Sequence, residues 1–321
     1  MASTRYLPPD LCDKRFPAVR FVIPGLIPEG VTLLVSRPKL GKSWLLQQIA
    51  GAVATGRSTL VEEPPAHGDV LHLILEDGNR RFQRRMTKYY GVSRENWPDR
   101  MTIVPKWRRL DDGGIDDMRE WCKSVPRPTL ITVDTLAKVR PEDKTNNKTK
   151  YAVDYQACEE LVKLTHEFPG LAIIVAHHDR KMDAEDVFDT VSGTLGLTGG
   201  VDTIALLKRS GLGITLHIQG RDLADNVEKA VTLDRETCRW MVLGEASEVQ
   251  RSKEWKLVLE VLREAGKDGL NVTAIMDRTG LRGRNSVDLL LRRMVKNAAI
   301  MRLHKRGMYA ASSDPMTDRT D

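Results

Sequence analysis

The segment SRPKLGKS, residues 36–43, places a lysine and a serine where a loop between a strand and a helix can bind phosphate. An apolar, β-branched stretch precedes it, and residues 42–55 carry apolar side chains at helical spacing. In such a unit, backbone N–H groups and the positive end of the helix dipole converge on an anion. We expect Lys42 to neutralise the β- and γ-phosphates of ATP and the Ser43 hydroxyl to coordinate Mg²⁺.

The segment follows the pattern G-x-x-x-x-G-K-[ST] except at its first position, where Ser36 replaces glycine. That substitution adds a side chain where the loop leaves the strand. We predict that the nucleotide is contacted by the whole loop and the first turn of its helix. These residues are Ser36, Arg37, Pro38, Lys39, Leu40, Gly41, Lys42, Ser43 and Trp44.

Two carboxylates follow other apolar strands. Asp134 ends LITVD, where it can reach Mg²⁺ through water or cap the next segment. Glu76 follows LHLIL and can polarise the water that attacks the γ-phosphate, with Asp77 as the less favoured alternative base. Because the carboxyl ends of parallel strands meet at one edge of a sheet, we expect these groups to lie near the phosphate loop.

A pair of histidines, His177 and His178, follows the apolar stretch IIVA. A polar donor at this strand end can contact the γ-phosphate and report its loss, although a structural role is the alternative. His177 is the preferred candidate because it comes first after the strand.

Strands and helices alternate along residues 30–178, and the strands are apolar on both faces. This alternation predicts an α/β fold with a mostly parallel sheet that is covered on both sides. After Gly200, four short β segments are expected to extend the sheet edge in antiparallel fashion. Residues 1–20 read as an N-terminal arm, 21–245 as the main domain, and 245–250 as a linker.

The excess positive charge is confined to residues 250–311, which hold 14 Lys/Arg against 6 Asp/Glu, a net charge of +8. Residues 1–249 hold 35 of each, so a basic module is joined to a neutral body. Helices at 251–265 and 271–280, a helix at 283–297 and two strands turning at Arg306-Gly307 predict a small winged-helix domain.

The helix at 283–297 would be the recognition helix of this domain, with Leu289, Leu290, Leu291 and Met294 on its buried face. The alternative use of such a domain is protein contact; its charge favours duplex DNA. Its expected DNA contacts are basic or amide side chains: Arg282, Arg284, Asn285, Arg292, Arg293, Lys305 and Arg306. The last ten residues, 312–321, are polar and expected to be disordered.

Residues 21–245 resemble the RecA-like P-loop ATPases of the RepA/DnaB hexameric helicase group, above all the RepA type of phages and plasmids. The matching segments, in order, are GLIPEGVTLLVSRPKLGKS, LILED, LITVDTL, IIVAHHDRK, LHIQGRD and RWMVLG. Ser36 is the departure from the family pattern. The resemblance implies that Glu76 is the catalytic base and that His177 is the γ-phosphate sensor.

The same resemblance implies a homo-oligomer, a hexameric ring, in which an arginine finger completes the neighbouring site. Arg209 and Arg221 match the finger best, and Lys208 is a third candidate. It also implies single-stranded DNA in a central channel, contacted by residues 137–150 and 181–196. Within the first loop, Lys148 and Lys150 are the expected phosphate contacts.

Three functions remain open at this point. The first is an ATP-driven, ring-forming DNA helicase or translocase that replicates a mobile element. The second is a regulatory ATPase that binds specific duplex DNA, and the third is a recombination mediator that forms filaments on single strands.

The chain has no run of eighteen apolar residues and no apolar N-terminal stretch. We therefore expect no membrane span and a cytoplasmic protein.

Overall fold

The computed structural model describes residues 8, 12–142, 150–178, 195–210, 213–296, 299–303 and 307–312. The chain divides into an N-terminal unit, Met1–Leu243, and a C-terminal unit, Gly244–Asp321. Among the described helices, none combines the length and the apolar character that crossing a bilayer requires.

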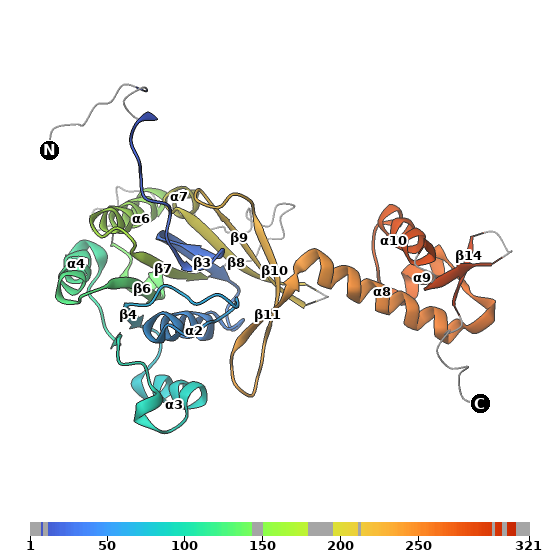
Figure 1. Cartoon of the computed structure of the whole chain (residues 1–321), viewed down its shortest axis with the longest axis horizontal. Coiled ribbons are helices and arrows are strands. Elements are labelled where there is room, and N and C mark those ends of the chain that lie inside the picture. The colour runs from blue at the N-terminus through green and yellow to red at the C-terminus, as the bar shows by residue number, and fades with distance from the viewer. Residues whose placement is uncertain are drawn as a thin grey trace. The chain divides into compact units, whose positions relative to one another are not determined.

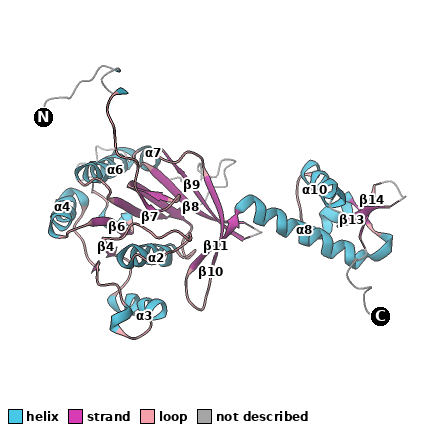
Figure 2. Cartoon of the chain, viewed as in Figure 1, coloured by secondary structure: helices cyan, strands magenta, loops and turns pink. Residues whose placement is uncertain are grey.

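A nine-stranded sheet forms the centre of the N-terminal unit, with the strand order β11-β10-β9-β8-β3-β7-β6-β4-β5 (Figures 1 and 2). Strands β8, β3, β7, β6, β4 and β5 run parallel, and β9 and β10 are antiparallel to their predecessors. The strands are β3 (Gly30–Ser36), β4 (Asp69–Ile74), β5 (Met101–Val104), β6 (Pro128–Asp134), β7 (Ala172–His178), β8 (Thr203–Ser210), β9 (Gly213–Gly220), β10 (Val227–Leu233) and β11 (Trp240–Glu245). A separate two-stranded sheet joins β1 (Phe21–Ile23) to β2 (Ile27–Pro28).

Helices cover both faces of the sheet (Figure 1). α2 (Lys42–Thr55) and α3 (Asn79–Tyr90) pack on one face, with Leu46 and Met86 in a core with alternate strand residues. α4 (Ile115–Ser124) and α6 (Lys150–Glu167) contribute Met118 and Leu161 to the core on the other face. The short helices are η1 (Arg94–Asn96), η2 (Leu110–Gly114), α5 (Leu136–Val139) and α7 (Leu195–Gly199). The two cores explain why the central strands are apolar on both faces.

The prediction of an antiparallel extension after Gly200 was wrong for its first strand. β8 pairs in parallel with β3, and the antiparallel pairing begins with β9 and continues in β10. A parallel strand needs a crossover connection, and residues 179–202 between β7 and β8 are long enough to provide it. β8 therefore extends the parallel part of the sheet beyond the phosphate loop.

The described residues of the C-terminal unit form three α-helices, one short helical turn and a three-stranded antiparallel sheet of order β12-β14-β13. The elements are α8 (Ala246–Ala265), η3 (Gly266–Asp268), β12 (Leu270–Asn271), α9 (Val272–Thr279), α10 (Arg284–Lys296), β13 (Ile300–Arg302) and β14 (Met308–Ala311). Val258, Ile275, Leu291 and Tyr309 form part of one core of its own.

The expected linker at 245–250 is wrong, because α8 begins at Ala246. This segment contains no glycine or proline beyond Gly244, and its alanine, glutamate and glutamine are good helix formers. Asn271 is the N-cap of α9, and its side chain accepts a hydrogen bond from Ala274 N at 2.8 Å.

Candidate nucleotide site

The phosphate loop joins the carboxyl end of β3 to the first residue of α2. Gly41, the last loop residue, has φ +107°, a conformation that favours glycine. A Cβ atom there would lie 3.0 Å from the Trp240 ring and 3.3 Å from Leu233. The Trp240 indole also donates to the Gly41 carbonyl at 3.1 Å. The glycine of the motif is therefore required by backbone conformation and by the close approach of β11.

Lys42 is buried and directs its ammonium group at the end of β3. Its Nζ donates to the Ser36 carbonyl at 2.8 Å and to the Ser36 hydroxyl at 3.1 Å. It also lies 3.1 Å from Nδ1 of His178. The serine that replaces the first motif glycine thus supplies a hydroxyl partner for the motif lysine, without moving that lysine away from the strand end.

Asp134 lies beside Ser43, as the sequence predicts for a magnesium site. The Ser43 side chain is hydrogen-bonded to the Asp134 carboxyl, which is almost fully buried at the end of β6. Burial raises the pKa of Asp134, and the nearby carboxylates of Glu76 and Asp77 act in the same direction, whereas the bond from Ser43 opposes them.

The residues at this point fit Mg²⁺ by their chemistry. A hydroxyl and a carboxylate are the oxygen ligands that Mg²⁺ prefers, usually with waters and substrate phosphates completing its shell. A divalent cation would also favour the ionised form of the buried Asp134 carboxyl. Ser43 and Asp134 would therefore hold the ion.

Glu76 lies at the same edge, one strand further from β3. Its Oε1 accepts a hydrogen bond from the Thr135 hydroxyl at 3.1 Å, and Nε2 of His178 lies 3.5 Å away. The side chain is 37 % exposed, so it can contact water as well as its protein partners. A general base needs both access to water and a fixed direction, and Glu76 has both.

Asp77 has a different environment, although it is adjacent to Glu76. Its buried carboxylate forms ion pairs with Arg81, at 2.9 Å, and with Arg85, both on α3. The residue that caps the start of α3 is Gly78, and no side chain caps this helix. Asp77 therefore ties α3 to the end of β4 and is not available as a base.

The two histidines at the end of β7 have different neighbours. His178 lies between Lys42 and Glu76, whereas His177 is electrostatically coupled to Asp154 of α6. Burial lowers the pKa of His177 to about 4, and Asp154 opposes this shift. The sequence-based preference for His177 assumed that the strand ends before it. In the structure β7 continues through His178, and successive side chains of a strand point to opposite faces, so His178 and not His177 faces Lys42.

Next to the phosphate loop lies a stacked group of side chains that the sequence did not predict. The Arg85 guanidinium lies 4.9 Å from the centre of the Trp44 ring, which stacks on Tyr89 at 5.9 Å. Burial lowers the pKa of Arg85, while Asp77 and Asp134 raise it. An arginine in the second turn of a helix gave no sequence signal, since it is not known which side of α3 faces the phosphate loop until the helix is packed.

The two arginine-finger candidates lie at opposite ends of the parallel strands. Arg209 is exposed near the end of β8, two residues past Leu207, which pairs with Ser36. Arg221 is exposed and lies 3.7 Å from Asp202, which accepts a hydrogen bond from Val31 N at the beginning of β3. Arg209 therefore lies at the carboxyl ends of the parallel strands, where the phosphate loop is, and Arg221 lies at their amino ends.

The predicted channel contacts are not described. Lys148 lies outside the described residues, and of Lys150 only its place as the first residue of α6 is described. Most of the second loop, residues 181–194, also lies outside them.

In the C-terminal unit, the described DNA-contact candidates are all exposed: Arg282, Arg284, Asn285, Arg292 and Arg293. Lys305 and Arg306 lie outside the described residues. The buried face of α10 was predicted wrongly at one position, because Leu289 is 50 % exposed and Val287 is buried instead. Residues 287, 290, 291 and 294 follow the helical repeat, and 289 falls on the opposite face.

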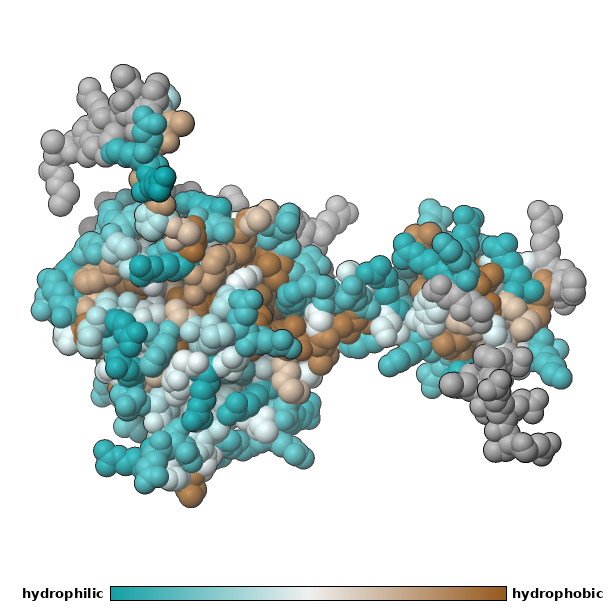
Figure 3. All heavy atoms as spheres, in the orientation of Figure 1, coloured by the Kyte–Doolittle hydropathy of each residue, from teal (hydrophilic) through white to brown (hydrophobic). Residues whose placement is uncertain are grey.

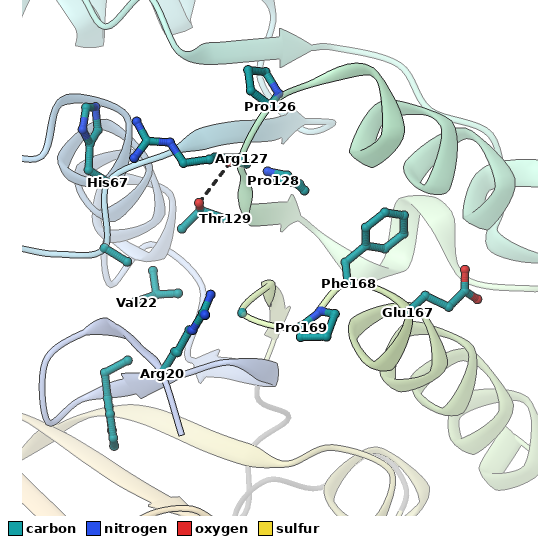
Figure 4. A pocket seen from close by; sticks show the side chains of 13 residues that line it. Arg20, Val22, His67, Pro126, Arg127, Pro128, Thr129, Glu167, Phe168 and Pro169 are labelled. Atoms are coloured by element: carbon teal, nitrogen blue, oxygen red, sulfur yellow. Dashed lines mark hydrogen bonds between the residues drawn. The ribbon is translucent and has the colours of Figure 1, made fainter. Parts of the chain in front are cut away.

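A hollow of about 410 Å³ lies at the amino ends of β6 and β7 (Figure 4). Arg20, His67 and Arg127 line it together with Pro169 and Phe168. Within it the Thr129 hydroxyl donates to the Arg127 carbonyl at 3.0 Å. The predicted nucleotide ligands lie at the other end of these strands, so this hollow is separate from the phosphate site.

Comparison with known proteins gives one family match and a set of structural likenesses. A family profile described as an AAA domain matches residues 3–184, more than half of the chain. No curated protein matches the chain. A solved structure of a DnaB-like replicative helicase, described with its interactions with primase, is 15 % identical with a TM-score of 0.51. The match covers 66 % of this chain and 57 % of that one, so the chain spans little more than half of the helicase.

A KaiC-like protein from the hyperthermophilic archaeon Pyrococcus horikoshii is 14 % identical, with a TM-score of 0.42. That match covers 70 % of this chain and 98 % of the archaeal one. At 15 % identity, the likeness to the helicase shows a shared RecA-like fold and leaves activity to be argued from the site itself.

Proposed function

Because the chain belongs to the AAA domain family and has the RecA-like P-loop ATPase fold, we propose that it is an ATP-hydrolysing, ring-forming DNA helicase or translocase. We place it with the RepA-type enzymes that replicate phages and plasmids. The observation that carries the proposal is the convergence of Lys42, Ser43–Asp134, Glu76 and His178 at one edge of the parallel sheet.

The site residues divide the hydrolytic step between them. Lys42 transfers its hydrogen bonds from Ser36 to the phosphate oxygens, and Ser43 and Asp134 would hold Mg²⁺. The ion would supply positive charge that stabilises the negative charge developing on the phosphates. Glu76 accepts a proton from water while the water oxygen bonds to the γ-phosphorus and the bond to the departing ADP oxygen breaks.

We assign the sensor role to His178 in preference to His177. One imidazole nitrogen of His178 lies by Lys42 and the other by Glu76, so a single ring contacts both the phosphate lysine and the base. Loss of the γ-phosphate changes the partners of Lys42, and His178 is positioned to pass that change to Glu76. His177 faces Asp154 on the other side of the strand.

A ring requires an arginine that reaches the neighbouring site, and Arg209 is the better candidate. It is exposed and lies at the same edge of the sheet as the phosphate loop, whereas Arg221 lies at the opposite edge. Mixing Arg209→Ala subunits into wild-type protein should reduce hydrolysis by more than their share of the subunits. A strictly proportional decrease would show that Arg209 does not act on a neighbour.

We further propose that the C-terminal unit is a winged helix that binds duplex DNA. α9 and α10 precede the antiparallel strands β13 and β14, and α10 exposes arginines on the side away from the core. This unit favours a second candidate function, a regulatory ATPase whose nucleotide state controls assembly on a duplex site.

A strand-displacement assay on a forked duplex separates the two candidates. The proposed helicase displaces a strand with ATP and Mg²⁺, but not with a non-hydrolysable analogue, and Lys42→Ala displaces none. Wild-type protein that hydrolyses ATP and binds duplex DNA without displacing a strand would favour the regulatory ATPase.

A further inference from the structure

Helix α3 carries a concentration of positive charge beside the catalytic edge. Its twelve residues include four arginines and one lysine and no acidic residue. Residues 1–249 hold 35 basic and 35 acidic side chains, so outside α3 this stretch holds 30 basic against 35 acidic ones. The surface over α3 is mostly hydrophilic (Figure 3).

The exposed arginines of α3 surround an open hollow of about 620 Å³. Arg80, Arg81 and Arg84 line it, together with Gln83 and Thr87 and the backbone of Gly78. Arg81 is held by Asp77, but the side chains of Arg80 and Arg84 have no acidic partner among the described residues. Two guanidinium groups are thus presented to one cavity.

This arrangement reduces the stability of the helix unless something neutralises it. Arg80 and Arg84 are four positions apart, as are Arg81 and Arg85, and like charges at this spacing repel. Arginine is also the side chain best suited to bidentate contact with phosphate oxygens, because its donors form a planar fork. A phosphate-bearing ligand would relieve the repulsion.

We propose that the hollow over α3 binds the phosphate backbone of single-stranded nucleic acid, with Arg80 and Arg84 as the principal contacts. The site deepens the proposed function and rests on it, since it names a second place where this ATPase holds its strand. Arginines on successive turns lie about 6 Å apart along the axis, which suits contact with a chain of phosphodiesters.

The position of α3 connects this site to hydrolysis. Arg81 lines the hollow and is also paired with Asp77, the residue after Glu76. A phosphate that enters the hollow competes with Asp77 for Arg81. Occupancy of the hollow therefore changes the environment of the end of β4, where the base lies.

The test compares the double variant Arg80→Ala/Arg84→Ala with wild type, using a fluorescent oligo-dT strand and the full chain. Neither residue belongs to the hydrolytic site, so hydrolysis without DNA should be unchanged. We expect affinity to fall on the order of tenfold. The slope of log affinity against log salt should decrease by about 1.4, because two phosphate contacts are lost.

The matched control is Arg94→Ala/Arg235→Ala, which removes two exposed arginines of the same unit outside α3. It should leave both the affinity and the salt slope at their wild-type values. An Arg80/Arg84 variant with the same affinity and slope as this control would overturn the proposal.

The outcomes separate this inference from the proposed function. If wild-type protein hydrolyses ATP and displaces strands while the Arg80/Arg84 variant binds oligo-dT normally, only the α3 site is wrong. If the variant binds oligo-dT normally but no longer self-associates, the arginines form a contact between copies and the nucleic-acid site is again overturned. If wild-type protein hydrolyses no ATP, the proposed function fails, whatever the variant binds.

Discussion

In the N-terminal unit, Lys42, Ser43, Asp134 and Glu76 are each held by a neighbouring side chain or backbone group, whereas the described residues of the C-terminal unit that are predicted to contact DNA lie on an exposed face. Lys42 and Asp134 are each about 5 % exposed or less, and their partners are set by the ends of β3, β6 and β7. Arg292 and Arg293 are exposed on α10.

The difference lies in what each kind of recognition demands. Hydrolysis requires donors and acceptors fixed before the reaction begins, and burial provides that fixation at a cost in desolvation. Binding a phosphate backbone requires positive charge and solvent access, and the gain comes largely from released counterions. Substitutions in the two regions should therefore differ in both size and kind.

The largest effect is expected from Lys42→Ala. Loss of the ammonium leaves the developing phosphate charge without its nearest donor, so hydrolysis should fall about a thousandfold. Lys123→Ala, which removes an exposed lysine of α4, should hydrolyse ATP at the wild-type rate. Steady-state phosphate release measures both, and normal turnover by Lys42→Ala would remove the phosphate-site assignment.

The variants Glu76→Gln and Asp77→Asn distinguish the roles of two adjacent carboxylates, one catalytic and one structural. Glu76→Gln should lower kcat about a hundredfold or more while leaving ATP binding largely intact, because a base is lost. Asp77→Asn should instead lower the free energy of unfolding by about 3 kcal/mol, because Arg81 and the partly buried Arg85 lose their counter-charge. Steady-state kinetics and urea unfolding of both variants give the comparison, and the reverse pattern would exchange the two roles.

The lowered pKa of His177 predicts that the N-terminal unit becomes less stable in acid. Its pKa is about 4 in the folded protein, below the ordinary value of 6.5, so the unfolded state binds its proton more readily. The stabilisation is therefore complete above about pH 6.5 and is lost as the pH falls towards 4. Between about pH 7 and 4.5, wild type should lose about 2–3 kcal/mol more stability than His177→Gln. Parallel urea titrations would contradict this if the two proteins lost equal stability.

The smallest effect is expected in the C-terminal unit. Arg292→Ala/Arg293→Ala should weaken duplex binding about tenfold and reduce the salt slope by about 1.8, with hydrolysis in the absence of DNA unchanged. Arg263→Ala/Lys267→Ala removes two exposed positive charges from α8 and η3 of the same unit and serves as the control. Equal duplex affinity and equal salt slope in the two variants would exclude α10 as the duplex-binding face.

The same contrast decides what could be predicted from the sequence. The phosphate loop, Asp134 and Glu76 were located correctly at strand ends, because apolar strands and the residues that end them are local features. The partners of those residues were not local. Whether His177 or His178 contacts Lys42 depends on where β7 ends, and a shift of one residue reverses the face.

Packing decided the remaining differences. Arg85 reaches the catalytic edge only because α3 folds back over Trp44, which no spacing along the chain reveals. Leu289 was assigned to the core from a run of three leucines, although the helical repeat leaves one of them exposed. The direction of β8 depended on the crossover that precedes it, so the sequence pattern alone could not separate a parallel from an antiparallel neighbour.

Steady-state ATP hydrolysis by the full chain, with and without single-stranded DNA, tests the central claim most directly. The account predicts magnesium-dependent hydrolysis that single strands stimulate severalfold and that duplex DNA stimulates less. Slow hydrolysis that is indifferent to single strands would contradict the helicase proposal while leaving the nucleotide site in place. Absence of any hydrolysis by the wild-type protein would contradict the assignment of the catalytic edge itself.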